Sequence, residues 1–238
     1  KTPTSQELPP GSLIIHMGHC SKKQMGIDVR GALGAGSVPL CAVVLFALAT
    51  STVALVAPQR ARAGRLGFGV ALHEAVAYTW LYRPNDTDDV TKEYVKKNAE
   101  YALLTRTLPY ADQVPPEMFF RYVLPYSHFD EPLDDWRQLF YDKLVDHVKN
   151  NSTLEAAAHS VWPVWYRAFD KNLSFKADQT PQIMAPISGT LKHGFASCTG
   201  LSIFLANCFR AVGIPARIVG TNEWNRPEKG SHNWVEVW

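Results

Sequence analysis

The chain has 238 residues, an almost even balance of charge and few cysteines. Its formal net charge is +2, with basic and acidic residues mixed along the chain, so no long basic face indicates a nucleic-acid partner. Four cysteines without a CxxC pair are too few for a disulfide scaffold. "HMGHC" offers three possible metal ligands (His16, His19 and Cys20), but no second cluster completes a zinc site, so no metal is expected. The length fits one good-sized domain, with or without an extension.

Two N-terminal segments differ sharply in composition. Residues 1–36 are rich in Gly, Ser, Pro and Lys and are expected to be poorly ordered. In residues 37–57, the run from Val38 to Ala57 carries no charge and could nearly cross a bilayer core of roughly 30 Å. Ala61-Arg62-Ala63 offers a small-x-small cleavage site downstream. We therefore expect secretion or membrane association through residues 38–57. The alternative is that this run forms a buried core helix in a cytoplasmic protein.

Helical patterns follow a linker and lead-in at residues 58–86. The segment "NDTDDVTKEYVKKNAEYALLTR" predicts a capped helix with one apolar face, made of Val90, Tyr94, Tyr101 and Leu104. Five prolines between Pro109 and Pro132 predict a loop-rich segment with one short helix near residues 118–123. Two further helices are expected. The first has its apolar period at Trp136, Phe140, Leu144 and Val148, and the second opens with a capping box from Ser152 to Glu155.

The last forty residues predict one apolar helix and two strands. The helix that follows Cys198 carries a broad apolar stripe, made of Leu201, Phe204, Leu205, Cys208, Phe209 and Val212. Gly213 and Pro215 should end it. Residues 216–221 and "SHNWVEVW" have strand character and are separated by a polar loop, so they should pair antiparallel. Helices followed by a central helix and strands indicate the α+β class.

Cys198 stands at the start of that helix and could be packing material, half of a disulfide, a metal ligand or a nucleophile. A bridge to Cys208 is excluded, because ten helical residues separate the Cα atoms by about 15 Å and a disulfide needs roughly 4.4–6.8 Å. Cys208 lies on the apolar stripe, which favours a buried core thiol. At Cys198, by contrast, unpaired backbone N–H groups and the helix dipole would favour a thiolate and could hold an oxyanion.

A nucleophilic thiol needs a base, and His232 is the best placed candidate. It falls in the second predicted strand and shares one face with Trp234 and Glu236, so its imidazole could project towards the helix N-terminus. His193 is nearer in sequence but precedes the helix in an expected loop.

These residues form a known pattern. "GFASCTGLSIFLANCFRAVGIPARIVG" followed by "SHNWVEVW" resembles the core of the transglutaminase-like superfamily, whose fold is related to papain. "YVLPYSHFDEPLDDWRQLFYDKL" resembles the lead-in of a bacterial-type subgroup, so the resemblance covers residues 87–238. It implies a papain/transglutaminase-like core. In such a core, a helical N-terminal part precedes a central Cys-bearing helix packed on an antiparallel sheet.

The resemblance also implies site roles and a reaction. Cys198 would be the nucleophile and His232 the general base, supported by Thr199 and by Trp234 as a wall of the site. The substrate would be a peptide or protein carboxamide, hydrolysed or transferred without any metal or organic cofactor. The family's third residue, usually an Asp on the next strand, would lie beyond Trp238, so we expect a domain truncated at its C-terminal end. The alternative is an inactive transglutaminase-like module that binds peptide or cell-surface polymer.

Overall fold

The computed structural model describes residues 13–15, 70–82, 90–223 and 230–238. The apolar segment 37–57 and the "HMGHC" motif lie outside these residues. Within the described ranges, no helix is long and apolar enough to cross a membrane.

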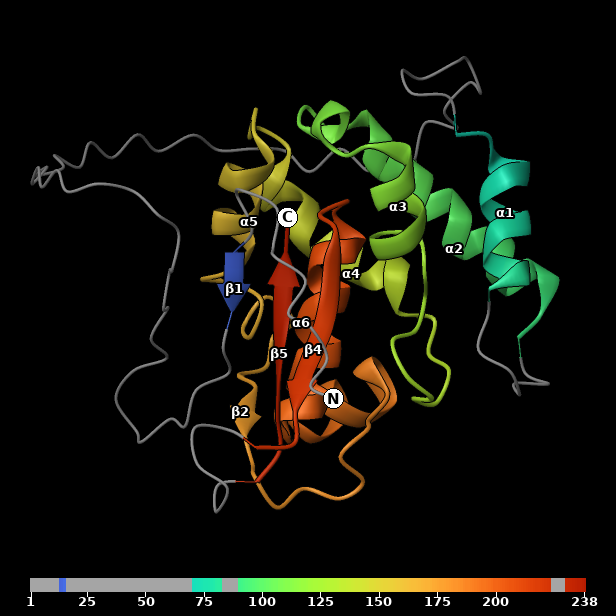
Figure 1. Cartoon of the computed structure of the whole chain (residues 1–238). Coiled ribbons are helices and arrows are strands. Elements are labelled where there is room, and N and C mark those ends of the chain that lie inside the picture. The colour runs from blue at the N-terminus through green and yellow to red at the C-terminus, as the bar shows by residue number, and fades with distance from the viewer. Residues whose placement is uncertain (1–12, 16–69, 83–89, 224–229) are drawn as a thin grey trace, which may run out of the picture.

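Helices make up most of the described chain, and a small sheet completes it (Figure 1). The α-helices are α1 (Leu72–Leu81), α2 (Lys92–Leu104), α3 (Pro116–Tyr122), α4 (Trp136–Val148), α5 (Leu154–Val161) and α6 (Cys198–Ala211). Shorter helical turns are η1 (Thr105–Thr107), η2 (Ala111–Gln113) and η3 (Pro186–Leu191). The strands are β1 (Leu13–Ile15), β2 (Ser174–Phe175), β3 (Phe195–Ala196), β4 (Ala216–Thr221) and β5 (His232–Val237). The class is therefore α+β, as the sequence predicts.

The main sheet has the order β1-β5-β4, and both of its pairings are antiparallel. The β4–β5 ladder runs from Ala216 opposite Val237 to Thr221 opposite His232, which confirms the two predicted strands. On the other side of β5, β1 pairs through Leu13 opposite Val237. Residues 13–15 therefore depart from the poor order expected of residues 1–36. A free strand edge has unpaired N–H and C=O groups, and a short apolar segment can satisfy them.

Helix α6 is the centre of the fold. It lies along one face of β4 and β5, behind the two red strands in Figure 1, and α4 and η3 also pack against it. All residues from Thr199 to Ala211 are buried, so the helix is enclosed on every side. The predicted apolar stripe accounts for only part of this burial, because Ser202 and Asn207 are buried as well.

Both ends of α6 are capped, by Ser197 at its start and by the predicted Gly213 just past its end. Ser197 Oγ accepts a hydrogen bond from the Gly200 N–H at 3.4 Å, and this satisfies one of the N–H groups that a helix start leaves without a partner. At the other end, the Ile214 N–H donates to the Phe209 carbonyl at 3.0 Å and the Gly213 N–H to Arg210 at 3.1 Å. This is a Schellman motif, and it needs the positive φ of +80° found at Gly213.

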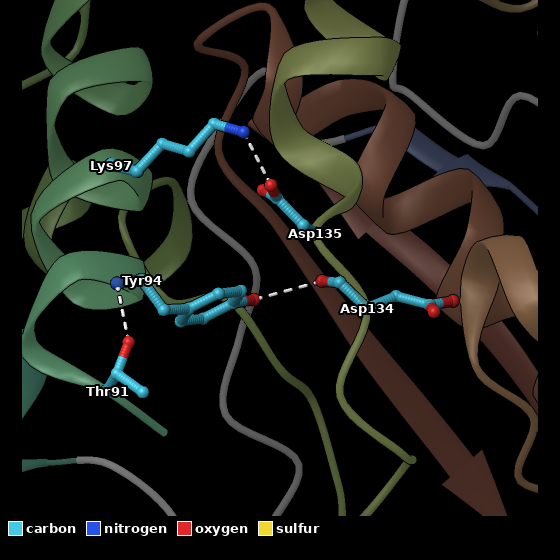
Figure 2. Close-up of polar contacts among 5 residues, drawn as sticks. All are labelled: Thr91, Tyr94, Lys97, Asp134 and Asp135. Atoms are coloured by element: carbon cyan, nitrogen blue, oxygen red, sulfur yellow. Dashed lines mark hydrogen bonds and ion pairs between the residues drawn. The ribbon is translucent and has the colours of Figure 1, made fainter. Parts of the chain in front are cut away.

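Helix α2 is rotated relative to the prediction. Its buried residues are Val95, Asn98, Ala99 and Ala102, whereas Tyr94, Tyr101 and Leu104 are only half-buried. The tyrosines lie at the margin because their hydroxyls need polar partners. Tyr94 donates to the carbonyl oxygen of Asp134 at 3.0 Å (Figure 2), and the small alanines fill the inner face.

The acidic pair before α4 joins three elements. Asp135 forms an ion pair with Lys97 of α2 at 2.5 Å (Figure 2). The Asp134 carboxylate accepts the N–H groups of Ile187 and Ser188 at 2.6 and 2.8 Å, so it caps the start of η3. The segment that leads into α4 therefore fixes both α2 and η3.

The start of α5 differs from the prediction by one residue. Thr153, and not Ser152, is the N-cap, and its side chain accepts from the Ala156 N–H at 3.2 Å. The apolar period predicted for α4 is confirmed, since Trp136, Phe140, Leu144 and Val148 are all buried.

Two buried arginines hold the loop before α4 against α6. Arg137 donates to Asn98 and to four backbone carbonyls, those of Val123, Leu124, Pro125 and Arg210. Arg210 donates to the carbonyls of Ala216, Pro125 and Ser127. Burial lowers the pKa of both guanidinium groups to about 9, so the hydrogen bonds offset a substantial desolvation cost.

His128 lies beside this pair, and its Nε2 is 2.9 Å from Asn207 Oδ1 of α6. Burial, followed by the charge of Arg210, lowers the pKa of His128 well below its ordinary value. The folded state therefore binds fewer protons than the unfolded state below about pH 6.5, and stability should fall as the pH falls.

Between about pH 7.5 and 5.5, the wild type should lose about 1 kcal/mol more unfolding free energy than His128→Gln. Urea titrations at both pH values measure this difference. If the unfolding free energies of the wild type and of His128→Gln fall equally with pH, His128 is not the residue responsible.

Candidate active site

Cys198 is the first residue of α6 and is half-buried. Ser197 anchors this end of the helix, because its hydroxyl also donates to the Gln182 carbonyl at 3.1 Å. In an α-helix, the N–H groups of the first turn have no partner within the helix. A thiolate at Cys198, or an oxyanion beside it, would therefore lie next to fixed N–H dipoles.

A hydrogen bond joins the neighbours of the two candidate catalytic residues. Asn233 Nδ2 donates to Thr199 Oγ1 at 2.7 Å, so the residue after Cys198 contacts the residue after His232. This contact places the start of α6 at the start of β5.

His232 lies on the other face of β5 from this hydrogen bond. Asn233 bonds to α6, and Val235 and Val237 belong to the buried core that contains α6. Because side chains alternate along a strand, His232, Trp234 and Glu236 share the opposite face. The His232 and Trp234 rings stack with centroids 6.4 Å apart. The predicted shared face is confirmed, and His232 is the first residue of β5, at the end of the sheet where Asn233 bonds to Thr199.

Two other candidate partners are engaged elsewhere. The Glu236 carboxylate pairs with the Arg217 guanidinium at 2.8 Å and accepts from Trp234 Nε1 at 3.4 Å, so its contacts hold the outer face of the sheet together. His193 is exposed, and its Nδ1 lies 2.7 Å from the Gly189 carbonyl oxygen. Its ring therefore bonds within its own helical turn.

Cys208 has the environment of a core thiol. It is 0% exposed, and burial raises its pKa well above the ordinary value.

We expect iodoacetamide to modify Cys198 in the native protein before Cys208, because only the thiolate of an accessible cysteine reacts. Peptide-level mass spectrometry measures the two rates, and denatured protein supplies the reference in which both react. Faster native labelling of Cys208 would overturn the nucleophile assignment.

An accessible thiol at the start of a buried helix, packed on an antiparallel sheet with histidine at a strand start, defines a candidate thiol-dependent enzyme. Residues 142–238 match the family model of the transglutaminase-like superfamily, so the chain contains a transglutaminase-like domain over this range. No curated protein and no solved structure matches the chain. The family match begins within α4, although α2 and α4 share one hydrophobic core with α6. The helices before residue 142 therefore belong to the same packed unit.

The sequence reasoning missed Asn233 and Gly220, which lie opposite each other in the β4–β5 ladder. A glycine inside a strand often marks the close approach of another group. This signal was present in "ARIVGT". Asn233 itself gives no separate signal, because it stands between two residues that the family pattern already explains.

Proposed function

We propose that the domain catalyses thiol-dependent acyl transfer or hydrolysis on peptide or protein carboxamides. Cys198 is the nucleophile, His232 is the general base, and the core is papain-like. The observation that carries this proposal is the Thr199–Asn233 hydrogen bond of 2.7 Å, which brings the cysteine end of α6 to the histidine end of β5. The transglutaminase-like match over both segments supports it.

In the proposed reaction, the Cys198 thiol gives its proton to His232 and Sγ attacks the carboxamide carbon. The N–H of Cys198 stabilises the tetrahedral oxyanion. Collapse of this intermediate breaks the C–N bond, and the leaving ammonia takes the proton from His232. Water or an amine then attacks the thioester, His232 removes the proton of the incoming group, and the thiol is regenerated. Trp234, stacked on His232, covers one side of the imidazole.

The test uses a mixture of glutamine-containing peptides with a fluorescent primary amine. We expect ammonia release, an acyl adduct on Cys198 in the mass spectrum and incorporation of the amine. Ammonia release without incorporation would indicate a hydrolase. If Cys198 forms no adduct and no ammonia appears, the catalytic proposal fails and a peptide-binding module becomes the better account. Secretion or membrane association through residues 38–57 is a separate proposal that rests on composition alone.

A further inference from the structure

The hydrogen bond between Thr199 and Asn233 is partly buried and joins two different elements. Thr199 is 5% exposed, and its hydroxyl accepts the Asn233 amide at 2.7 Å. A hydrogen bond of this kind between two side chains from different elements fixes both distance and orientation. It joins the second residue of α6 to the second residue of β5.

Gly220 makes room for this arrangement on the neighbouring strand. It pairs directly with Asn233 in the β4–β5 register, and a Cβ at Gly220 would collide with Asn233 Oδ1. The missing side chain of Gly220 therefore leaves the space in which the Asn233 carboxamide lies. Any side chain there would displace the carboxamide from Thr199.

We propose that Thr199, Asn233 and Gly220 form a positioning latch that sets the location of Cys198 relative to His232. The inference rests on the proposed function, because it assigns the latch to the same cysteine and histidine. His232 precedes Asn233 and points to the other face of β5. The hydrogen bond of Asn233 therefore also fixes the backbone from which the His232 side chain extends. Rotation or withdrawal of α6 at Thr199 would move the thiol directly, since Cys198 is its neighbour.

The experiment measures the rate of Cys198 alkylation by iodoacetamide over a pH series, by peptide-level mass spectrometry. Asn233→Ala and Thr199→Val each remove one partner of a single hydrogen bond. We expect the rate near neutral pH to fall about three- to tenfold and the pH profile to differ from that of the wild type. Thr199→Ser keeps the hydroxyl and should stay near wild type. Gly220→Ala changes neither hydrogen-bonding residue, but its Cβ would displace the Asn233 carboxamide. It should therefore give the same result as Asn233→Ala.

The matched control is Ile218→Val, on the same strand and packed against the same core. It should lower the melting temperature without moving the pH profile, which separates a loss of stability from a loss of positioning. Cys208 reports opening of the fold, because it should stay unlabelled in every folded variant. If Asn233→Ala and Thr199→Val keep the wild-type profile, the latch is wrong.

His232→Ala separates this inference from the proposed function. A profile that moves in His232→Ala but not in the latch variants keeps the Cys–His pair and overturns the latch. A profile that moves in the latch variants but not in His232→Ala overturns both the base assignment and the claim that the latch serves it. Movement in both sets of variants supports the inference.

Discussion

Replacing either Cys198 or His232 with Ala should lower amine incorporation by about 10³-fold or more and leave a small residual rate. His232 takes the proton of the Cys198 thiol while Sγ attacks the carboxamide carbon. Removing either residue therefore disables the same step. The double variant should therefore be no slower than the slower single variant, because residues that work as a unit are strongly non-additive. The rates are measured with the glutamine-containing peptides and fluorescent amine described above.

His193→Ala is the matched control for the base assignment. This histidine is exposed and bonds to the Gly189 carbonyl, so the variant should keep the wild-type rate. A loss of activity in His193→Ala with full activity in His232→Ala would transfer the role of base to the other histidine. Additive losses in the Cys198 and His232 variants would show that they do not act on the same step.

Replacing Arg137 with Met should destabilise the protein by about 2–3 kcal/mol, because buried acceptors lose a charged hydrogen-bond donor. The guanidinium donates to Asn98 and four backbone carbonyls, and the variant would remove one donor from each of these acceptors. Such a loss is a large fraction of the 5–15 kcal/mol that typically stabilises a domain. Chemical denaturation followed by tryptophan fluorescence measures the change.

Two variants make that measurement specific. Arg137→Lys keeps the charge but cannot reproduce the planar set of donors, so it should recover only a minor part of the loss. Arg121→Met removes an exposed arginine and should change stability by no more than about 0.5 kcal/mol. Equal effects of the buried and exposed substitutions would mean that the buried network contributes little.

The parts of the fold that depend on local chemistry could be predicted from the sequence. The start of α6 follows from Ser197, its end from Gly213, and the second strand of the hairpin from the alternation in "SHNWVEVW". Local patterns also predicted the shared face of His232 and Trp234. Each of these features depends on residues that are close in the chain.

The features that the sequence did not predict depend on contacts between distant segments. The tyrosine pattern of α2 suggested the wrong inner face, because Tyr94 finds its partner at Asp134, forty residues away. Arg137 gave no sign of burial, since its five acceptors come from three separate segments. The Asn233–Thr199 contact was invisible for the same reason. It exists only once α6 lies on β5.

The pairing of β1 with β5 restricts how the chain can relate to a membrane. β1 precedes the apolar run at residues 38–57 and β5 follows it, yet the two strands are hydrogen-bonded neighbours. A single crossing would put the flanks of that run in different compartments, and twenty residues suffice for only one crossing. Cleavage after Ala63 would likewise separate β1 from the chain that carries β5. A molecule that keeps this ladder therefore has β1 and β5 on one side of any membrane.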